Sequence, residues 1–207
     1  EKKSGKICAV VSQLRFSDVS AKVKDAIESG SLGKIVEVGL HMKYHRDEEY
    51  YSNSSWRGTY AMDGGGALMN QGIHGIDLLI NYFGLPESVF AYCRTKHHRI
   101  EVEDTAVAVL EYKDGPVGVI EATTSIAPGY PRRLEICGTK GSIIIEEDSI
   151  KKWDVPGEAV ASDMPSARSY SEPSAISHRG HKKEFEEIID AIKEGRKPLV
   201  NTNEGKK

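Results

Sequence analysis

The strongest constraint on the fold is a series of short strand-like segments that fills the middle of the 207-residue chain. Each segment is rich in apolar and β-branched residues, and polar turns such as 113–116 and 138–141 separate several of them. Short segments joined by such turns predict one large, mostly antiparallel open sheet. The expected strands are residues 34–44, 88–95, 105–112, 117–125, 133–137, 142–146 and 150–153.

One of these segments is apolar on both faces. Ala106, Ala108 and Leu110 would lie on one face of the strand, whereas Val107 and Val109 would lie on the other. A face open to water would carry polar residues at alternate positions. We therefore expect helices on one face of the sheet and a second subunit on the other, in a homodimer or a dimer of dimers.

Amphipathic segments before and after the strands supply the expected helices. Residues 18–29 place apolar side chains at helical spacing, with Ser17 or Asp18 as the N-cap and Gly30 after the end. Residues 178–194 repeat this pattern near the C-terminus. Their apolar stripe consists of Phe185, Ile188, Ile189 and Ile192. A sheet with helices on one face is an α+β fold.

Three further segments complete the expected layout. Residues 7–11 are apolar and β-branched, which predicts a buried strand. Residues 46–60 are rich in aromatic and charged side chains without a clear period, and loops of this length often carry function. Residues 156–177 are rich in Ser, Pro and Ala, which predicts another loop.

The charge of the chain restricts the class of its partners. Acidic residues outnumber basic ones by 31 to 28, for a formal net charge of −3. Such a chain has no basic field for a phosphate backbone, so nucleic acid is not an expected partner. The apolar run at 7–11 is too short to span a bilayer, so we expect no membrane partner. The first residues include neither Met nor an apolar leader, which indicates a cut inside a longer polypeptide.

The three cysteines indicate the redox environment. Cys8, Cys93 and Cys137 are far apart, odd in number and set in apolar strand-like segments. This pattern predicts buried free thiols in a reducing compartment, and we expect a cytoplasmic protein.

The densest chemistry lies where three consecutive glycines lead into a helix expected at 71–83. Helical spacing would place Asn70, His74 and Asp77 on one face. Asp77 could hold one ring nitrogen of His74 and leave the other for acid–base chemistry, while Asn70 could bond a substrate hydroxyl. These three residues form the expected catalytic group, and Gln71 is an expected substrate contact.

Other interpretations of the same residues stay open. His74 could be an ordinary helix histidine at a domain boundary, with its polar atoms bonded inside the protein. His74 and Asp77 offer two ligands, fewer than a metal site needs, so no metal is expected. The glycines do not form a dinucleotide fingerprint, which requires G-x-G-x-x-G between a strand and a helix.

The long loop offers further candidate contacts. Trp56 provides a flat apolar face and Arg57 a planar cation, a pair suited to a ribose, a base, a pyrophosphate or a carboxylate. We expect both to contact a cofactor, with ordinary loop packing as the alternative. Thr59 and Tyr60 of this loop are expected substrate contacts, as is Arg15, for which a structural salt bridge is the alternative.

Several motifs together resemble the second domain of the glucose-fructose oxidoreductase, inositol dehydrogenase and rhizopine catabolism (Gfo/Idh/MocA) family of nicotinamide-dependent sugar oxidoreductases. The most specific motif is the stretch 64–77, and the resemblance covers almost the whole chain. Weaker matches lie at 13–16, 30–35, 56–59, 103–106 and 134–141.

The resemblance implies a division of labour between two domains. In that family an N-terminal Rossmann domain binds NAD or NADP, and a lysine in a Glu-Lys-Pro motif works with a histidine of the second domain. That histidine matches His74, and the polar residue one turn earlier matches Asn70. Lys2 is followed by lysine in place of proline, so no catalytic role is assigned to it. Residues 1–16 would end a Rossmann domain, and residues 17–207 would form the substrate-binding and dimerisation domain.

The resemblance also implies a reaction. The intact protein would transfer hydride between a sugar carbon and a nicotinamide, whereas the isolated chain would be inactive. Within the family, positions 56–59 with Asn70 and Gln71 look most like dehydrogenases of nucleotide-linked amino sugars or uronates. Two alternatives stay open: a non-enzymatic sugar-binding or regulatory dimer, and hydrolysis of a glycosidic bond by transient oxidation.

Overall fold

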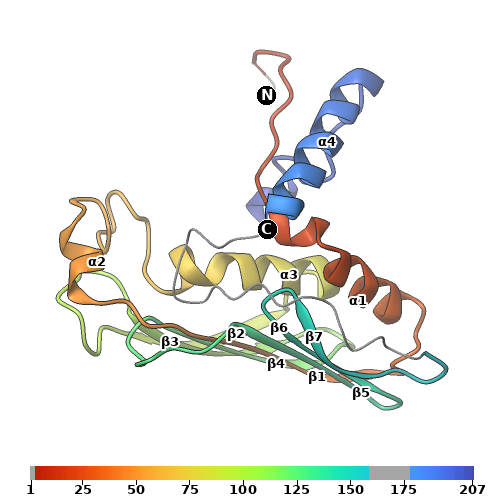
Figure 1. The fold of residues 1–207 in the computed structure, drawn as a ribbon, viewed down its shortest axis with the longest axis horizontal. Helices are drawn as coiled ribbons and strands as arrows, with labels where there is room; N and C mark the ends of the chain where they lie inside the picture. The colour runs from red at the N-terminus through yellow and green to blue at the C-terminus, as the bar shows by residue number, and fades with distance from the viewer. Residues whose placement is uncertain (1–2, 159–177) are drawn as a thin grey trace.

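The computed structural model describes residues 3–158 and 178–207 (Figure 1). Within these ranges, seven strands form one sheet in the order β2-β3-β4-β1-β5-β6-β7. β1 pairs parallel with β4, and the other neighbours pair antiparallel. The prediction of a mostly antiparallel open sheet is confirmed. The strands are β1 Ile35–Lys43, β2 Ser88–Arg94, β3 Thr105–Glu111, β4 Val117–Thr123, β5 Arg133–Gly138, β6 Ser142–Glu146 and β7 Ser149–Asp154.

Helices α1 and α3 lie on one face of the sheet, while α4 lies beyond them near the N-terminal segment (Figure 1). The start of α1 is fixed by Ser17, whose side chain accepts the backbone N–H of Ser20 at 3.0 Å. The predicted N-cap is therefore confirmed. The α-helices are α1 Asp18–Glu28, α2 Glu48–Ser52, α3 Ile73–Phe83 and α4 His178–Glu194; short 3₁₀ turns span η1 Gln13–Phe16 and η4 Glu204–Lys206.

The core lies between the sheet and the two helices α1 and α3. Alternate residues of β1, Val38, Leu40 and Met42, point toward the helices and are fully buried. Val23 of α1 and Leu79 of α3 belong to the same cluster. Full burial of one such side chain stabilises the fold by about 1.5–3 kcal/mol, so this layer fixes α3 against the sheet.

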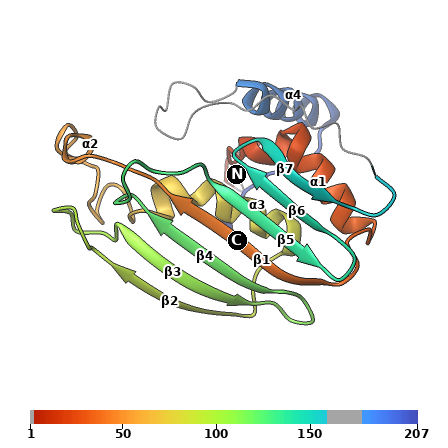
Figure 2. The ribbon, with the colours of Figure 1, turned by 60° about the horizontal axis from the view of Figure 1, so that its bottom comes forward.

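The opposite face of the sheet is open in the single chain (Figure 2). On β3, Ala108 and Leu110 are buried under the helices, whereas Val107 and Val109 are 46% and 48% exposed. The expectation that this strand is apolar on both faces is confirmed. Phe90 of β2, which pairs with Val109, extends the exposed apolar surface toward the sheet edge.

The predicted strand at 7–11 is wrong. The segment forms one isolated bridge, between Ala9 and Asn201, and the N–H of Val10 donates to the carbonyl of Val200 at 2.9 Å. It runs beside the C-terminal segment and joins no sheet among the described residues, so its β-branched residues were a misleading signal. Val11 is 49% exposed.

The prediction of buried cysteines is also wrong. The three cysteines are free, but Cys8 and Cys93 are exposed and Cys137 is only partly buried. Cys8 lies in the segment that forms no strand, and Cys93 lies on the edge strand β2, all of whose residues are exposed. Neither position receives cover from α1 or α3.

Helix α4 has the predicted bounds but buries a different side. Phe185 is 54% exposed and Ile189 is 48% exposed, whereas Glu184 and Ala191 are buried. The Glu184 carboxylate accepts the N–H of Ser12 at 2.6 Å, so the helix turns this polar side toward the N-terminal segment. The helix leaves most of its apolar stripe uncovered within the described residues.

Two smaller expectations have partial outcomes. The loop predicted at 46–60 contains the short helix α2 and is otherwise irregular. Most of the loop predicted at 156–177 lies outside the described residues. Among the helices of the described ranges, none combines the length and apolar character needed to cross a bilayer.

Candidate functional site

The helix of the candidate site begins with a π-helical turn, Leu68–Gly72, which continues directly into α3. The N–H of Gly72 bonds the carbonyl of Ala67 at 2.8 Å, which is an i→i+5 bond. The predicted helix therefore starts before residue 71, and its first turn is wider than the regular α-helical spacing assumed. Asn70 lies in this wide turn and His74 in the regular helix.

Glu103 caps this turn from a distant part of the sequence. Its carboxylate accepts the N–H groups of Gly66 and Leu68, both at 3.0 Å, and its carbonyl accepts that of Ala67 at 2.9 Å. A Cβ atom on Gly66 would lie 1.7 Å from the Glu103 carbonyl oxygen. The third glycine therefore serves a close backbone contact, and it does not make room for a substrate.

His74 is half-buried near the start of α3. Burial lowers its pKa below the ordinary value of 6.5, the charge of Arg132 and electrostatic repulsion from His181 lower it further, and Asp77 opposes them. The ring is consequently neutral near pH 7 and can accept a proton. Arg132 and His181 lie 58 and 107 positions downstream of His74, so no local sequence pattern connects them with this ring.

Asp77 is held by Arg15. Its two carboxylate oxygens accept from the Arg15 Nε and Nη2 atoms at 2.8 and 2.7 Å, in a bidentate ion pair. Arg15 also contacts Glu204 at 3.4 Å, and its side chain is only 9% exposed. This is the salt-bridge alternative described for Arg15. The substrate role of Arg15 and the orientation of His74 by Asp77 stay predictions.

A chain of hydrogen bonds joins the π-helical turn to the long loop. The Asn70 amide donates to Asp63 at 2.9 Å, and Asp63 also accepts the N–H of Gly58 at 3.0 Å. Gln71 donates to the Tyr50 hydroxyl at 3.1 Å. The structure therefore brings Asn70 and Gln71 together with the loop, one turn before His74.

The other predicted loop contacts lie beside this chain of bonds. The Arg57 guanidinium lies 4.3 Å from the centre of the Tyr50 ring and 5.2 Å from that of Trp56. Thr59 donates to the Trp56 carbonyl at 2.7 Å, and Tyr60 is 64% exposed. Their roles toward a cofactor or a substrate stay predictions.

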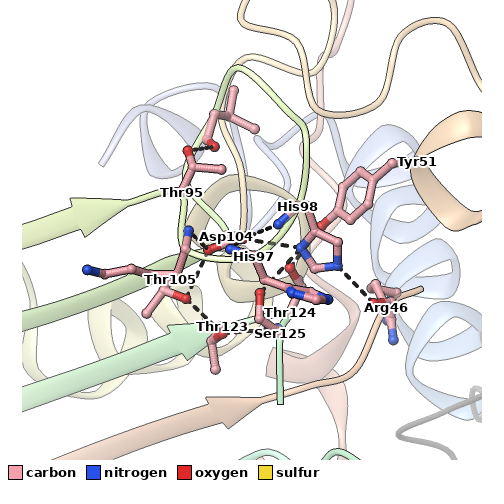
Figure 3. A network of polar contacts seen from close by, with 12 residues as sticks. Arg46, Tyr51, Thr95, His97, His98, Asp104, Thr105, Thr123, Thr124 and Ser125 are labelled. Carbon is pink, nitrogen blue, oxygen red and sulfur yellow. Dashed lines mark hydrogen bonds and ion pairs between the residues drawn. The ribbon is translucent and has the colours of Figure 1, made fainter. Parts of the chain in front are cut away.

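A buried polar network, missed in the sequence, fixes the base of the loop (Figure 3). Asp104 is fully buried and accepts the N–H groups of Lys96, His97 and His98 at 2.8–2.9 Å. Burial alone would raise its pKa, but these bonds and the Thr105 hydroxyl lower it to about 2. The carboxylate is ionised at all ordinary pH values.

His98 connects this carboxylate to the loop. Its Nε2 atom lies 2.9 Å from the Arg46 carbonyl, and because that oxygen only accepts, Nε2 carries a proton. Its Nδ1 atom lies 3.3 Å from Asp104 and 3.3 Å from the Ser125 hydroxyl. The Tyr51 ring packs on the imidazole, with the ring centres 4.7 Å apart. Arg46 and Tyr51 of the loop are therefore both held by His98, which lies in the β2–β3 connection.

No group of three or more His, Cys, Asp and Glu residues with the geometry of a metal site occurs in the described ranges. A cavity of about 450 Å³ is lined by Tyr82, Phe83 and Tyr112, at the other end of α3 from His74. We assign the candidate site to the His74 end, because the groups that can move a proton are there.

The sequence matches the GFO/IDH/MocA C-terminal domain family over residues 20–144. It is 29% identical over 189 residues to the uncharacterized oxidoreductase YhhX of Escherichia coli, covering 86% of this chain and 52% of that protein. It is 26% identical over 197 residues to the myo-inositol 2-dehydrogenase of Thermotoga maritima, covering 93% and 56%. The chain spans about half the length of these relatives.

A solved structure with the same fold is the WlbA dehydrogenase of Bordetella pertussis, in complex with NADH and UDP-GlcNAcA. It superposes with a TM-score of 0.83 and 32% sequence identity, over 99% of this chain and 58% of that one.

Proposed function

The chain belongs to the Gfo/Idh/MocA oxidoreductase family through its C-terminal domain, and on that premise we propose that it forms the substrate side of a nicotinamide-dependent sugar dehydrogenase. The relatives named above include an inositol dehydrogenase and a dehydrogenase in complex with a nucleotide sugar. We extend the proposal to sugars and nucleotide sugars as the substrate class, and to hydride transfer at a sugar carbon.

The observation that carries the proposal is the neutral histidine beside a polar turn. His74 is half-buried, and burial, Arg132 and His181 lower its pKa, so that it is uncharged near pH 7. A neutral imidazole can take the proton of a sugar hydroxyl as the carbon is oxidised. Asn70, in the turn before it, offers its amide oxygen to the substrate, because its amide nitrogen is bonded to Asp63 and the oxygen, which Gln71 contacts at 3.3 Å, has a second lone pair.

Asp77 contributes through charge and position in this proposal. Its carboxylate raises the pKa of His74 against the larger effect of burial, so it stabilises the imidazolium formed after proton transfer. The bidentate bond to Arg15 holds that carboxylate in place. His74, Asn70 and Asp77 thus form the proposed catalytic group, and Gln71, Thr59 and Tyr60 are proposed substrate contacts.

The glycine stretch does not have the form of a dinucleotide fingerprint. The glycines enter the helix from a loop, and the Glu103 carbonyl closes the backbone at Gly66. We propose that NAD or NADP, which accepts the hydride, is held mainly by a second domain, with Trp56 as a contact from this one. The exposed apolar stripe of α4, including Phe185 and Ile189, supports packing against further protein.

The proposal is tested with a polypeptide that carries this domain together with a nucleotide-binding domain. NAD and NADP reduction is measured on a panel of polyols, sugars and nucleotide sugars. The proposal predicts reduction of at least one cofactor with at least one member, and no reduction by the 207-residue chain alone. Failure of the two-domain polypeptide on every class would contradict it.

The second candidate is a sugar-binding or regulatory module without chemistry. The closed Gly66 contact favours it, because the Glu103 carbonyl occupies the place where a phosphate could approach the backbone of that glycine. Calorimetry separates the two functions, because sugar binding by a two-domain polypeptide that never reduces a cofactor would support the module without chemistry. Turnover of the bound sugar would contradict that candidate.

We also propose that two copies associate through the open face of the sheet, as a homodimer or within a dimer of dimers. Support comes from Val107, Val109 and Phe90, which expose apolar side chains on neighbouring strands. Three free cysteines support a reducing compartment, for which we propose the cytoplasm.

A further inference from the structure

Two arginines of the long loop belong to a stack of alternating rings and guanidinium groups. The Arg46 guanidinium lies 5.7 Å from the centre of the Tyr44 ring and 5.3 Å from that of Tyr50. Arg57 lies on Tyr50 at 4.3 Å and on Trp56 at 5.2 Å. Stacking holds the planar cations in place by their faces and leaves their edges for hydrogen bonds.

Neither cation is neutralised by the part of the chain that the structure describes. Arg46 donates from Nη1 to the His45 carbonyl at 2.8 Å, and Arg57 donates from Nη1 to the Tyr50 carbonyl at 3.1 Å. Within the described ranges neither forms an ion pair with a carboxylate, and the buried Nε atom of each has no protein acceptor. A guanidinium has five N–H donors and each arginine places an Nη1 donor on a carbonyl, so the other Nη donors of each retain capacity for an anionic oxygen.

The sheet fixes Arg46 from beneath (Figure 3). Its N–H donates to the Thr124 carbonyl at 2.7 Å, and its carbonyl accepts from His98 at 2.9 Å. The neighbouring Tyr51 hydroxyl lies 2.8 Å from that of Thr124. A cation on such an anchored backbone binds an anion with little loss of conformational entropy.

The stack also lies beside the proposed reaction site. The hydroxyl of Tyr50, whose ring contacts both cations, accepts from Gln71, and Gln71 also contacts the Asn70 amide oxygen at 3.3 Å. The nearest acid of this chain of bonds, Asp63, is already bonded to Asn70 and to the Gly58 N–H. Within the described ranges, Arg46 and Arg57 thus lie near the turn that carries Asn70 without a carboxylate bonded to either of them.

We propose that Arg46 and Arg57 form an anion-binding pair that selects sugars with a carboxylate or phosphate group. This inference rests on the proposed function for the position of the sugar. A carboxylate on the sugar ring and the diphosphate of a nucleotide sugar present the same chemistry, oxygens that can accept from guanidinium edges. The pair would exclude neutral polyols from tight binding, because these leave both cations without a partner.

The test is calorimetric titration of the 207-residue chain, which needs no cofactor and no turnover. Four ligands are compared: UDP-N-acetylglucosaminuronate, UDP-N-acetylglucosamine, myo-inositol and NAD. We expect both UDP-sugars, or the uronate alone, to bind at least about tenfold more tightly than myo-inositol. If the two UDP-sugars bind equally well, the diphosphate is the recognised anion. If UDP-N-acetylglucosamine, which lacks the carboxylate, binds more weakly than the uronate, the carboxylate is the recognised anion.

Variants then connect the anion to the arginines. Arg46→Gln and Arg57→Gln should each weaken binding of the uronate roughly 10- to 100-fold. Arg57→Lys keeps the charge but loses the planar stack, and should weaken it less. The matched control is Arg94→Gln, because Arg94 also stacks on a tyrosine, at 5.7 Å from Tyr92, and donates to the preceding carbonyl, but lies on the edge strand β2. Urea midpoints of all variants show that they fold.

Three results would overturn the inference: unchanged affinity in both glutamine variants, binding of neither UDP-sugar, or arginine-dependent binding of NAD but not of the sugars. The outcome is independent of the dehydrogenase proposal. A two-domain polypeptide that oxidises only neutral polyols would contradict the anion-binding pair and leave His74 as the base. Anion binding by a protein that never reduces a cofactor would support the anion-binding pair and contradict the dehydrogenase proposal.

Discussion

Asp104→Asn is expected to destabilise the protein far more than a surface substitution of the same kind. The carboxylate is fully buried, and its pKa of about 2 lies below its ordinary value of 3.8. That difference corresponds to about 2 kcal/mol of stability at neutral pH. The substitution removes the charge while it keeps the shape of the side chain.

The amide adds a second loss. Oδ1 of Asp104 accepts from the Lys96 N–H and the Thr105 hydroxyl, and Oδ2 accepts from the N–H groups of His97 and His98. An asparagine places an NH₂ group at one of these positions, where it faces at least one backbone donor. A buried donor left without an acceptor costs about 1–3 kcal/mol, so the total loss should be about 3–5 kcal/mol.

The assay is urea unfolding of both proteins at pH 7 and at pH 3. A depressed carboxylate pKa contributes stability above the unfolded pKa and loses it as the pH falls through the folded pKa. At pH 3, between 3.8 and about 2, roughly half of the charge contribution is already lost, so the difference between the two proteins should shrink by about 1 kcal/mol. The m-values should stay equal.

Asp114→Asn is the matched control, since Asp114 is exposed in the β3–β4 turn with a left-handed φ of 55° that asparagine also adopts. It should change the free energy of unfolding by less than about 0.5 kcal/mol. A loss below about 1 kcal/mol for Asp104→Asn at pH 7, or a loss that does not change with pH, would refute the account of this network.

Three further predictions concern the site and the assembly. Gly66→Ala should destabilise the protein by about 3 kcal/mol or more in urea unfolding, because its Cβ would overlap the Glu103 carbonyl. The matched control Gly30→Ala, at a φ of +70° with open space, should cost only about 1–2 kcal/mol, and equal losses would contradict this. In sedimentation at micromolar concentration, Val109→Arg should reduce the mass of the protein from that of a dimer to that of a monomer. Leu85→Arg, outside the open sheet face, should leave the mass unchanged, and a monomeric wild type would contradict the proposed dimer. Because the pKa of His74 is lowered from its ordinary value of 6.5, the midpoint of the acidic fall in kcat/KM for sugar oxidation should lie below pH 6.5, and a midpoint above pH 6.5 would oppose this.

The local parts of the fold were predictable from the sequence because they depend on nearby residues. Turn residues and alternation identified the strands, and helical spacing with Ser17 as the cap identified α1. The two-sided apolar character of β3 follows from the period of two alone. The same reasoning failed at 7–11, where β-branched residues occur without a neighbouring strand to pair with.

The long-range contacts of the site were beyond such reasoning. Glu103 caps a turn 35 positions away, and Arg15 binds Asp77 across 62 positions. No local period links these pairs, so the sequence pattern alone identified neither the cap on the glycine turn nor the ion pair that holds Asp77. The His98–Asp104 pair is local, only six positions apart, but its burial depends on how the β2–β3 connection meets Arg46.

The most direct test of the account is the turnover of His74→Ala in a polypeptide that carries this domain with a nucleotide-binding domain. His45→Ala is the matched control, because His45 is an exposed histidine of the neighbouring loop. With a substrate that the wild type oxidises, we expect a loss in kcat of roughly 10²- to 10⁴-fold for His74→Ala and none for the control. A His74→Ala protein that retains wild-type kcat would contradict the assignment of His74 as the group that takes the sugar proton.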